Sequence, residues 1–290
     1  MSQIHQPVLV NEVLTVLKPK KNDSYLDLTA GYGGHASAIL NQTNNYQESV
    51  LVDRDITSTT FLQNLFVGKP IIIVKEDYYQ ASINLEKQGK LFDIILADLG
   101  VSSQHFNDKN RGFSFKDNGP LDMRMDQGQS LSAMQVINEY SEKEIARVLK
   151  EYGDEPKARL IAKLIINSRP IISTRELADI CLKAWPGRSK VHPATRTFQA
   201  IRIEVNQELS QLSLSLPIWL KLLKPGGRLA VISFHSLEDR IVKHFFKEKN
   251  GEHYDSEVMI LTKKPIIPTK NETVNNPRSR SAKLRAVVKK

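Results

Sequence analysis

The sequence predicts an α/β protein with a mostly parallel sheet that is interrupted by an inserted all-helical domain. Strand and helix patterns alternate through the first third of the chain, as they do in parallel sheets with crossover helices. A glycine-rich turn follows the first strand pattern, within Tyr25–Ala36. From about Val101 to Leu209 the strand patterns stop, and they return after Leu216. These observations together predict one discontinuous sheet domain.

The first third contains four strand patterns separated by helical patterns. Strands are expected at 25–29, 49–53, 70–75 and 92–98, with helices near 35–42, 56–66 and 80–88. The fourth strand, Phe92–Asp98, is a continuous apolar run that ends in an acid. Such runs are typical of strands buried on both faces of a sheet.

The inserted block shows helix starts and helical periodicity only. Ser141-Glu-Lys-Glu144 and Ser173-Thr-Arg-Glu176 match the capping-box pattern. The apolar spacing predicts one helix over Thr195–Leu212. We expect a helical domain at 104–210 and a sheet domain formed by 1–103 with 211–290.

The last part of the chain returns to the sheet pattern. Lys224-Pro-Gly-Gly227 predicts a turn into a strand at 228–234, followed by a helix at 237–247. Ser236 would cap this helix; the alternative is that His235 and Ser236 line the ligand pocket. Two more strands are expected near 256–262 and 282–288. The prediction is therefore a seven-stranded sheet.

Composition excludes several classes of protein. Hydrophobic residues make up 40% of the 290 residues, but no apolar run is long enough to span a membrane, and the N-terminus lacks a signal-peptide pattern. The single cysteine, Cys181, permits no internal disulfide and no cysteine-rich metal site. The seven histidines show no short metal-binding spacing. We therefore expect no metal, no membrane and a reducing, cytoplasmic location.

The charge of the chain predicts a polyanionic partner. The formal net charge is +9, and the tail Asn276–Lys290 contains no acid. Basic side chains that neutralise phosphates release bound counterions, which favours binding to nucleic acid. The alternative is a basic surface that serves only solubility.

The glycine turn and the next acid predict a nucleotide-like cofactor. Gly31-x-Gly33-x-x-Ala36 fits a turn that brings backbone close to a ligand. Asp53 ends the second strand, where a carboxylate can accept hydrogen bonds from ribose hydroxyls. The glycine turn and Asp53 suit a dinucleotide or S-adenosyl-L-methionine. The alternative is that the turn is purely structural. Asp27 inside the first strand and the insertion after the fourth favour a methyltransferase sheet.

Six segments resemble one family, the bacterial 16S ribosomal RNA cytosine-N4 methyltransferases of the MraW/RsmH type. They are His5-Gln-Pro-Val-Leu9, Asp27–His35, Asp98-Leu-Gly-Val-Ser-Ser103 with Arg111-Gly-Phe-Ser-Phe115 and Pro120–Asp126, His192–Asn206, Ser233–Lys243, and Asn276–Arg280. The resemblance spans nearly the whole chain, and its motifs are long.

The resemblance implies a class I, Rossmann-like methyltransferase that depends on S-adenosyl-L-methionine. Its substrate would be the exocyclic N4 of a cytosine in the decoding region of 16S ribosomal RNA, in the small ribosomal subunit. The oligomeric state stays open between a monomer and a homodimer. Matched residue by residue, the cofactor contacts fall on Gly33, Gly34, His35, Asp53, Tyr78 and Asp98. The next family contact is a glutamine; here His105 occupies that position and Gln104 precedes it.

The chemistry itself suggests a catalytic role for Asp98. The N4 lone pair is delocalised into the cytosine ring, so methyl transfer needs in-line alignment and benefits from an acceptor for the amino hydrogens. Asp98 ends the fourth strand and is the leading candidate; a hydrogen bond to the cofactor is its alternative role. Ser102 and Ser103 would orient the base, or merely form a turn. Carbon-5 methylation would need a thiolate, and Cys181 lies in an apolar helical stripe.

The inserted domain carries candidates for RNA contacts. We expect some of its arginines to hold phosphates and others to form internal ion pairs: Arg111, Arg124, Arg196 and Arg202. Phe113 and Phe115 would stack on a flipped base or belong to the core.

Two alternative functions stay open from the residues. An NAD-dependent oxidoreductase would use the same glycine turn, but the in-strand Asp27 and the Asp98-Leu-Gly segment count against it. A non-catalytic ribosome assembly factor would have no need of the intact turn and Asp53.

Overall fold

The computed structural model describes residues 7–101, 106, 108–187, 191–251 and 256–290. The chain divides into two compact units. The first comprises residues up to Gly100 together with Leu209–Lys290, and the second comprises Val101–Glu208. The boundaries expected from the sequence lay after residues 103 and 210.

The first unit is built on a sheet that has seven strands within the described part of the chain. They are β1 (Tyr25–Asp27), β2 (Val50–Asp53), β3 (Ile72–Lys75), β4 (Phe92–Asp98), β5 (Leu223–Ser233), β6 (Val258–Ile260) and β7 (Lys283–Lys289). Their order is β3-β2-β1-β4-β5-β7-β6, and β7 runs in the direction opposite to the other six strands. The predicted class I methyltransferase sheet is confirmed.

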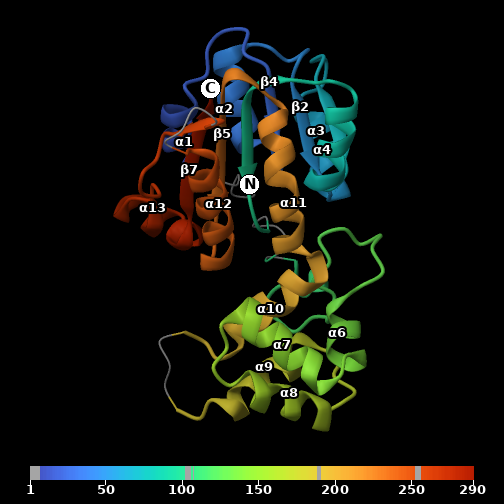
Figure 1. Cartoon of the computed structure of the whole chain (residues 1–290). Helices are drawn as coiled ribbons and strands as arrows, with labels where there is room; N and C mark the ends of the chain where they lie inside the picture. The colour runs from blue at the N-terminus through green and yellow to red at the C-terminus, as the bar shows by residue number, and fades with distance from the viewer. Residues whose placement is uncertain (1–6, 102–105, 107, 188–190, 252–255) are drawn as a thin grey trace. The chain divides into compact units, whose positions relative to one another are not determined.

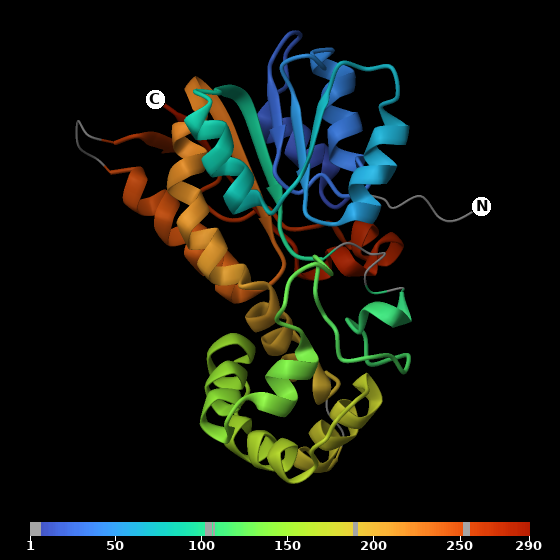
Figure 2. The same cartoon turned by 90° about the vertical axis from the view of Figure 1, so that its right-hand side faces the viewer.

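Helices cover both faces of this sheet (Figures 1 and 2). One face carries α1 (Val10–Leu17), α2 (Gly34–Thr43) and α3 (Ile56–Leu65), and the other carries α4 (Tyr78–Lys87), α11 (Glu208–Lys221) and α12 (Ser236–Lys249). Alternate residues of β4 feed the two cores: Leu96 packs with the first set of helices and Ile95 with the second. Strand β4 is therefore buried on both faces, as its apolar run predicted.

The predicted turn at Lys224–Gly227 lies inside β5. Leu223 pairs with Phe92, whereas Arg228 pairs with Ile94, so the intervening residues bulge out of the ladder. Gly226 has a φ of 78°, which glycine adopts without strain. Strand β5 thus starts earlier than expected.

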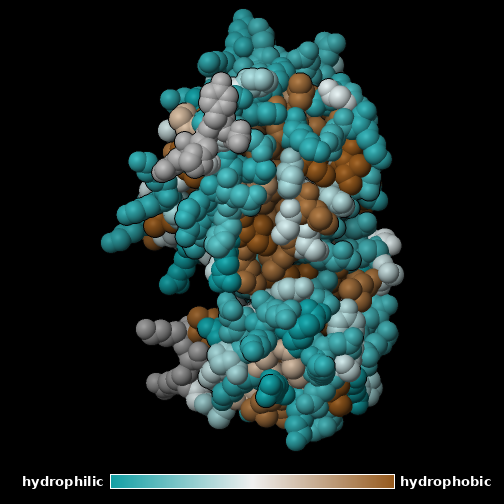
Figure 3. Space-filling model, in the orientation of Figure 1, coloured by the Kyte–Doolittle hydropathy of each residue, from teal (hydrophilic) through white to brown (hydrophobic). Residues whose placement is uncertain are grey.

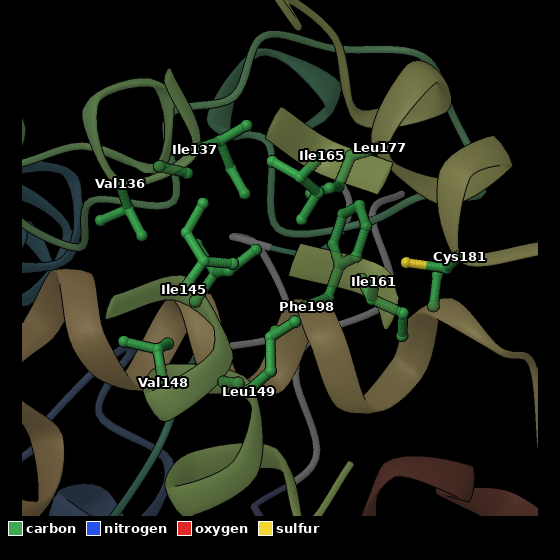
Figure 4. Close-up of a cluster of buried hydrophobic side chains, with 14 of the residues drawn as sticks. Val136, Ile137, Ile145, Val148, Leu149, Ile161, Ile165, Leu177, Cys181 and Phe198 are labelled. Atoms are coloured by element: carbon green, nitrogen blue, oxygen red, sulfur yellow. The ribbon is translucent and has the colours of Figure 1, made fainter. Parts of the chain in front are cut away.

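The second unit is helical in its described part. Its helices are α6 (Ala133–Glu139), α7 (Glu142–Gly153), α8 (Ala158–Asn167), α9 (Thr174–Ala184) and α10 (Ala194–Asn206), with a short 3-10 turn η1 (Lys109–Arg111). Ser141 and Glu144 form the predicted capping box at the start of α7. The helices bury one apolar cluster, in which Phe198, Ile161 and Cys181 lie close together (Figure 4).

The single helix predicted over Thr195–Leu212 is wrong. Helix α10 ends at Asn206, Gln207 adopts a left-handed φ of 51°, and α11 begins at Glu208. The buried Asn206 side chain fixes this end, since its Nδ2 donates to the Met123 carbonyl and its Oδ1 accepts from the Met125 N–H. Apolar periodicity continued across the break because both helices bury a stripe.

The chain ends with a short helix, a turn and the last strand. Helix α13 (Lys270–Asn275) and the 3-10 turn η2 (Pro277–Ser281) lead into β7. Among the described residues, no helix combines the length and the apolar character that crossing a membrane requires.

Candidate active site

The glycine turn connects β1 to α2 and is fastened to the end of β2. Gly33 has a φ of 76°, and a Cβ added there would lie 2.6 Å from Cδ2 of Leu65. The Gly31 N–H donates to Oδ2 of Asp53 over 2.8 Å, and the Asp55 N–H donates to Oδ1 over 2.9 Å. Both carboxylate oxygens of Asp53 are therefore held in place by backbone.

The buried His35 and the half-buried Asp98 form a pair beside this turn. His35 lies in the first turn of α2, and its Nε2 is 3.6 Å from Oδ2 of Asp98. The Asp98 N–H donates to Oγ1 of Thr29 over 2.6 Å, which fixes the end of β4 against the turn.

Three side-chain atoms of this pair lack hydrogen bonds. Within the described residues, neither ring nitrogen of His35 nor Oδ1 of Asp98 has a partner, although all three atoms are buried. Buried polar atoms in folded proteins are nearly always bonded, so such atoms call for a bound group. An imidazole and a carboxylate suit the carboxylate, amino and hydroxyl groups of an S-adenosyl-L-methionine molecule, so these residues fit that cofactor.

A fully buried acid, Asp27, lies next to the turn. Tyr25 Oη donates to Oδ2 of Asp27 over 2.6 Å, and the Thr29 N–H donates to Oδ1 over 3.1 Å. Burial raises the pKa of Asp27 to about 6, although the Tyr25 hydrogen bond and the charge of His35 oppose this change. Sequence reasoning missed the role of Tyr25, yet two residues of separation on a strand place both side chains on one face.

Tyr78 is the first residue of α4, the helix that follows β3 in the chain. Asp77 caps this helix by accepting from the N–H groups of Tyr79 and Gln80. The Tyr78 ring packs edge-on against Trp219 with centroids 5.6 Å apart, and the Arg54 guanidinium lies 5.9 Å from it. Tyr78 is only 7% exposed. The part of the Tyr78 ring that a bound molecule could reach is thus small and fixed in place.

The helix after β5 starts differently from the prediction. Ser236 is already the first residue of α12, and His235 caps it, with its Nδ1 accepting from the Glu238 N–H. The Phe234 N–H in turn donates to Oε2 of Glu238 over 2.8 Å. The predicted Ser236 cap is wrong, because an imidazole nitrogen serves as the acceptor.

The structure thus brings most of the predicted cofactor residues to one edge of the sheet. Strands β2, β1 and β4 are neighbours, and their carboxyl ends carry Asp53, the glycine turn with Gly33, Gly34 and His35, and Asp98. Ligands of open α/β sheets bind at this edge. The other predicted residues, Ser102, Ser103, Gln104 and His105, lie outside the described residues, so their roles stay predictions.

The candidate arginines of the helical unit are engaged within it. Arg124 pairs with Asp122 and Arg202 with Glu208. Arg111 is buried and donates to the carbonyls of Arg124 and Met125. Arg196 donates to the Asp154 carbonyl, and it is the most exposed of these four arginines. The predicted internal ion pairs are therefore confirmed for Arg124 and Arg202.

The aromatic and thiol groups of the same unit belong to its core. Phe113 is buried, and Phe115 stacks on His192 with centroids 4.4 Å apart. Cys181 is fully buried (Figure 4), and this burial raises the pKa of its thiol to about 12. A thiol held in this way is not a nucleophile near neutral pH.

Comparisons with known proteins show the family of this chain. Residues 2–290 match the model of the MraW methylase family. The chain is 45% identical over 291 residues to the ribosomal RNA small subunit methyltransferase H of Trichormus variabilis, covering 99% of this chain and 92% of the relative. It is 46% identical over 287 residues to the protein of the same name from Thermosipho melanesiensis, covering 97% of this chain and 96% of the relative.

The likeness to solved structures is weaker. An rRNA methylase from Streptococcus thermophilus superposes with a TM-score of 0.40 at 8% identity, covering 97% of this chain and 93% of that one. The family assignment therefore rests on the sequence matches. From the whole-chain match and these relatives, the chain belongs to the MraW methylase family and is a methyltransferase that depends on S-adenosyl-L-methionine.

Proposed function

We propose that this protein methylates the exocyclic N4 of a cytosine in the decoding region of 16S ribosomal RNA, within the small ribosomal subunit. The relatives named above support the ribosomal substrate. The observation that carries the choice of N4 is the half-buried Asp98, whose buried Oδ1 has no hydrogen-bond partner among the described residues. This atom provides an acceptor at the cofactor edge of the sheet.

Several residues would hold the cofactor. Asp53 would accept from ribose hydroxyls, because its carboxylate is already positioned by two backbone N–H groups. His35 would bind the methionine part through its ring nitrogens, which form no hydrogen bond within the described residues, and Tyr78 would line the adenine side. S-adenosyl-L-methionine supplies a methyl group on a sulfonium, which leaves as a neutral thioether.

Asp98 would act on the amino group that receives the methyl. An acceptor for the N4 hydrogens returns electron density to a nitrogen whose lone pair is delocalised, and it takes the proton that N4 must lose. The bond from the Asp98 N–H to Thr29 fixes this carboxylate at the end of β4. Ser102 and Ser103 would orient the base from the following segment, and His105 or Gln104 would add a cofactor contact.

The competing reactions are less well supported. Carbon-5 methylation would need a thiolate, and Cys181 is a core residue of the helical unit. Family membership counts against an NAD-dependent oxidoreductase. A non-catalytic assembly factor would leave the buried unpartnered groups of His35 and Asp98 without a use.

The test is to map modified cytosines in small-subunit RNA by mass spectrometry. Cells lacking this protein should lose N4-methylation at one decoding-region cytosine, and the wild-type chain should restore it. Restoration by an Asp53→Ala chain should be weak under limiting cofactor. An unchanged N4-methylation pattern, or a loss confined to carbon-5 methylation, would rule out the proposal.

A further inference from the structure

The positive charge of this protein is concentrated at its C-terminal end. From Lys263 onward the chain has nine basic residues and one acid, Glu272, so this segment supplies eight of the nine net charges. The four candidate arginines of the helical unit, by contrast, are bonded within that unit: Arg111, Arg124, Arg196 and Arg202. The sequence alone did not show which basic side chains are bonded within the protein and which are exposed and able to bind a partner.

The structure separates them. Lys283 and Arg285 pair with Asp239, and Lys289 donates to the carbonyls of Leu220 and Leu223, so these three hold β7 in place. Four others are exposed and form no ion pair or side-chain hydrogen bond within the described parts of the chain. They form the C-terminal basic rim: Lys263, Lys264, Lys270 and Arg280.

The topology places this rim at the cofactor edge of the sheet. Strand β7 is antiparallel to β5, and its first residue, Lys283, pairs with Ser233, the last residue of β5. Ile266 likewise forms a bridge to Leu284. The residues that lead into β7 therefore lie where the parallel strands end, which is the edge that carries Asp53 and Asp98.

A second connection fixes α13 near the glycine turn. Oε1 of Glu272 accepts from the Leu9 N–H over 2.8 Å. Two residues earlier, Pro7 packs on Gly34, since a Cβ added to Gly34 would lie 3.1 Å from Cβ of Pro7. In the orientation of Figure 3, the surface over α12 and α13 carries mainly hydrophilic side chains.

We propose that the C-terminal basic rim binds the phosphodiester backbone of the RNA strand that carries the target base. This inference rests on the proposed function, because it names how the first unit holds that substrate beside Asp98. Exposed cations without an ion-pair partner give up no internal interaction when they bind phosphate. Four of them along one edge would release counterions from several consecutive phosphates.

The experiment compares two variants with the same change of charge. The rim variant is K263Q/K264Q/K270Q/R280Q. The control is K20Q/K21Q/K87Q/K90Q, whose exposed lysines precede β1 and β4 and so lie at the opposite edge of the sheet. The full-length proteins are titrated with purified unmethylated small ribosomal subunits at several salt concentrations, and thermal unfolding checks that both variants fold.

The rim variant should bind at least tenfold more weakly than the control at moderate salt. The slope of log affinity against log salt should become shallower by roughly 0.7–0.9 for each phosphate that the rim no longer neutralises. If all four rim residues contact phosphate, the total change in slope should be about three. The single-turnover methylation rate at saturating subunit should stay unchanged, because no rim residue touches the reacting atoms. Equal affinities and slopes for the two variants would overturn the inference. A wild-type protein that binds subunits without methylating N4 would instead refute the proposed function, and the comparison of binding would still decide on the rim.

Discussion

Tyr25 donates a 2.6 Å hydrogen bond to Asp27 in a site where both side chains are fully buried. The two residues lie on one face of β1, directly below the glycine turn. Asp27 also holds the turn through the Thr29 N–H, and Thr29 in turn accepts from the Asp98 N–H. A single chain of contacts thus connects a buried acid with the carboxylate that we place at the methyl acceptor.

The raised pKa of Asp27 predicts a pH dependence of stability. Because its pKa rises from 3.8 to about 6 on folding, its stabilising contribution is complete below the unfolded value and is lost as pH rises through about 6. Asp27→Asn removes this dependence. Relative to that variant, the wild-type free energy of unfolding should fall by about 1–2 kcal/mol between about pH 5 and pH 8. Denaturant titrations at both pH values measure the difference, and parallel curves would mean that Asp27 is ionised throughout.

The Asp53 carboxylate should contribute directly to cofactor affinity. Asp53→Ala removes a charged acceptor that two backbone N–H groups hold in place, so S-adenosyl-L-methionine binding should weaken by about 1.5–3 kcal/mol. Calorimetric titration measures this loss, and NAD in the same experiment should bind to neither protein. An Asp23→Ala variant, in the loop before β1, serves as the control. Unchanged affinity in a folded Asp53→Ala protein would refute the ribose assignment.

Gly33 and Gly68 have nearly the same φ, so comparing them distinguishes backbone strain from crowding by neighbouring side chains. Gly33 has a φ of 76° and Gly68 a φ of 75°, but only at Gly33 would an added Cβ meet another side chain, at 2.6 Å. Each change to alanine should cost about 1 kcal/mol of stability from the left-handed conformation. Gly33→Ala should in addition displace Leu65 and weaken cofactor binding. Thermal unfolding and cofactor titration of both variants test this, and equal cofactor affinities would mean that the turn tolerates the methyl group.

The sequence predicted the sheet well for a physical reason. Buried parallel strands are apolar runs, and the acids that end them, Asp27, Asp53 and Asp98, stand out against such runs. The end of α10 was not predictable in this way. It depends on Asn206, whose amide bonds to the backbone of Met123 and Met125, more than eighty residues earlier in the chain.

In the candidate site, too, local sequence patterns predicted some features, whereas others depend on contacts between distant residues. Its residues were found because each follows a strand or a glycine turn. The partners of these residues were not found: the hydrogen bond from Tyr25 to Asp27, the Thr29 hydroxyl under Asp98, and the packing of Trp219 on Tyr78. The sorting of basic side chains into structural and exposed ones also depends on tertiary contacts, as the pairing of Arg285 with Asp239 illustrates. Composition gives only the total charge.

The central claim is that Asp98 assists the reacting nitrogen, and a paired measurement on Asp98→Asn tests it most directly. The amide keeps an acceptor oxygen, so the fold and much of the cofactor affinity should persist. The single-turnover rate on purified unmethylated small subunits should fall about 10²-fold or more, the scale of losing a positioned acid–base group. Cofactor titration and single-turnover methylation are done on the same preparation. A variant with a normal single-turnover rate and weakened cofactor binding would contradict the claim and assign Asp98 to the cofactor alone.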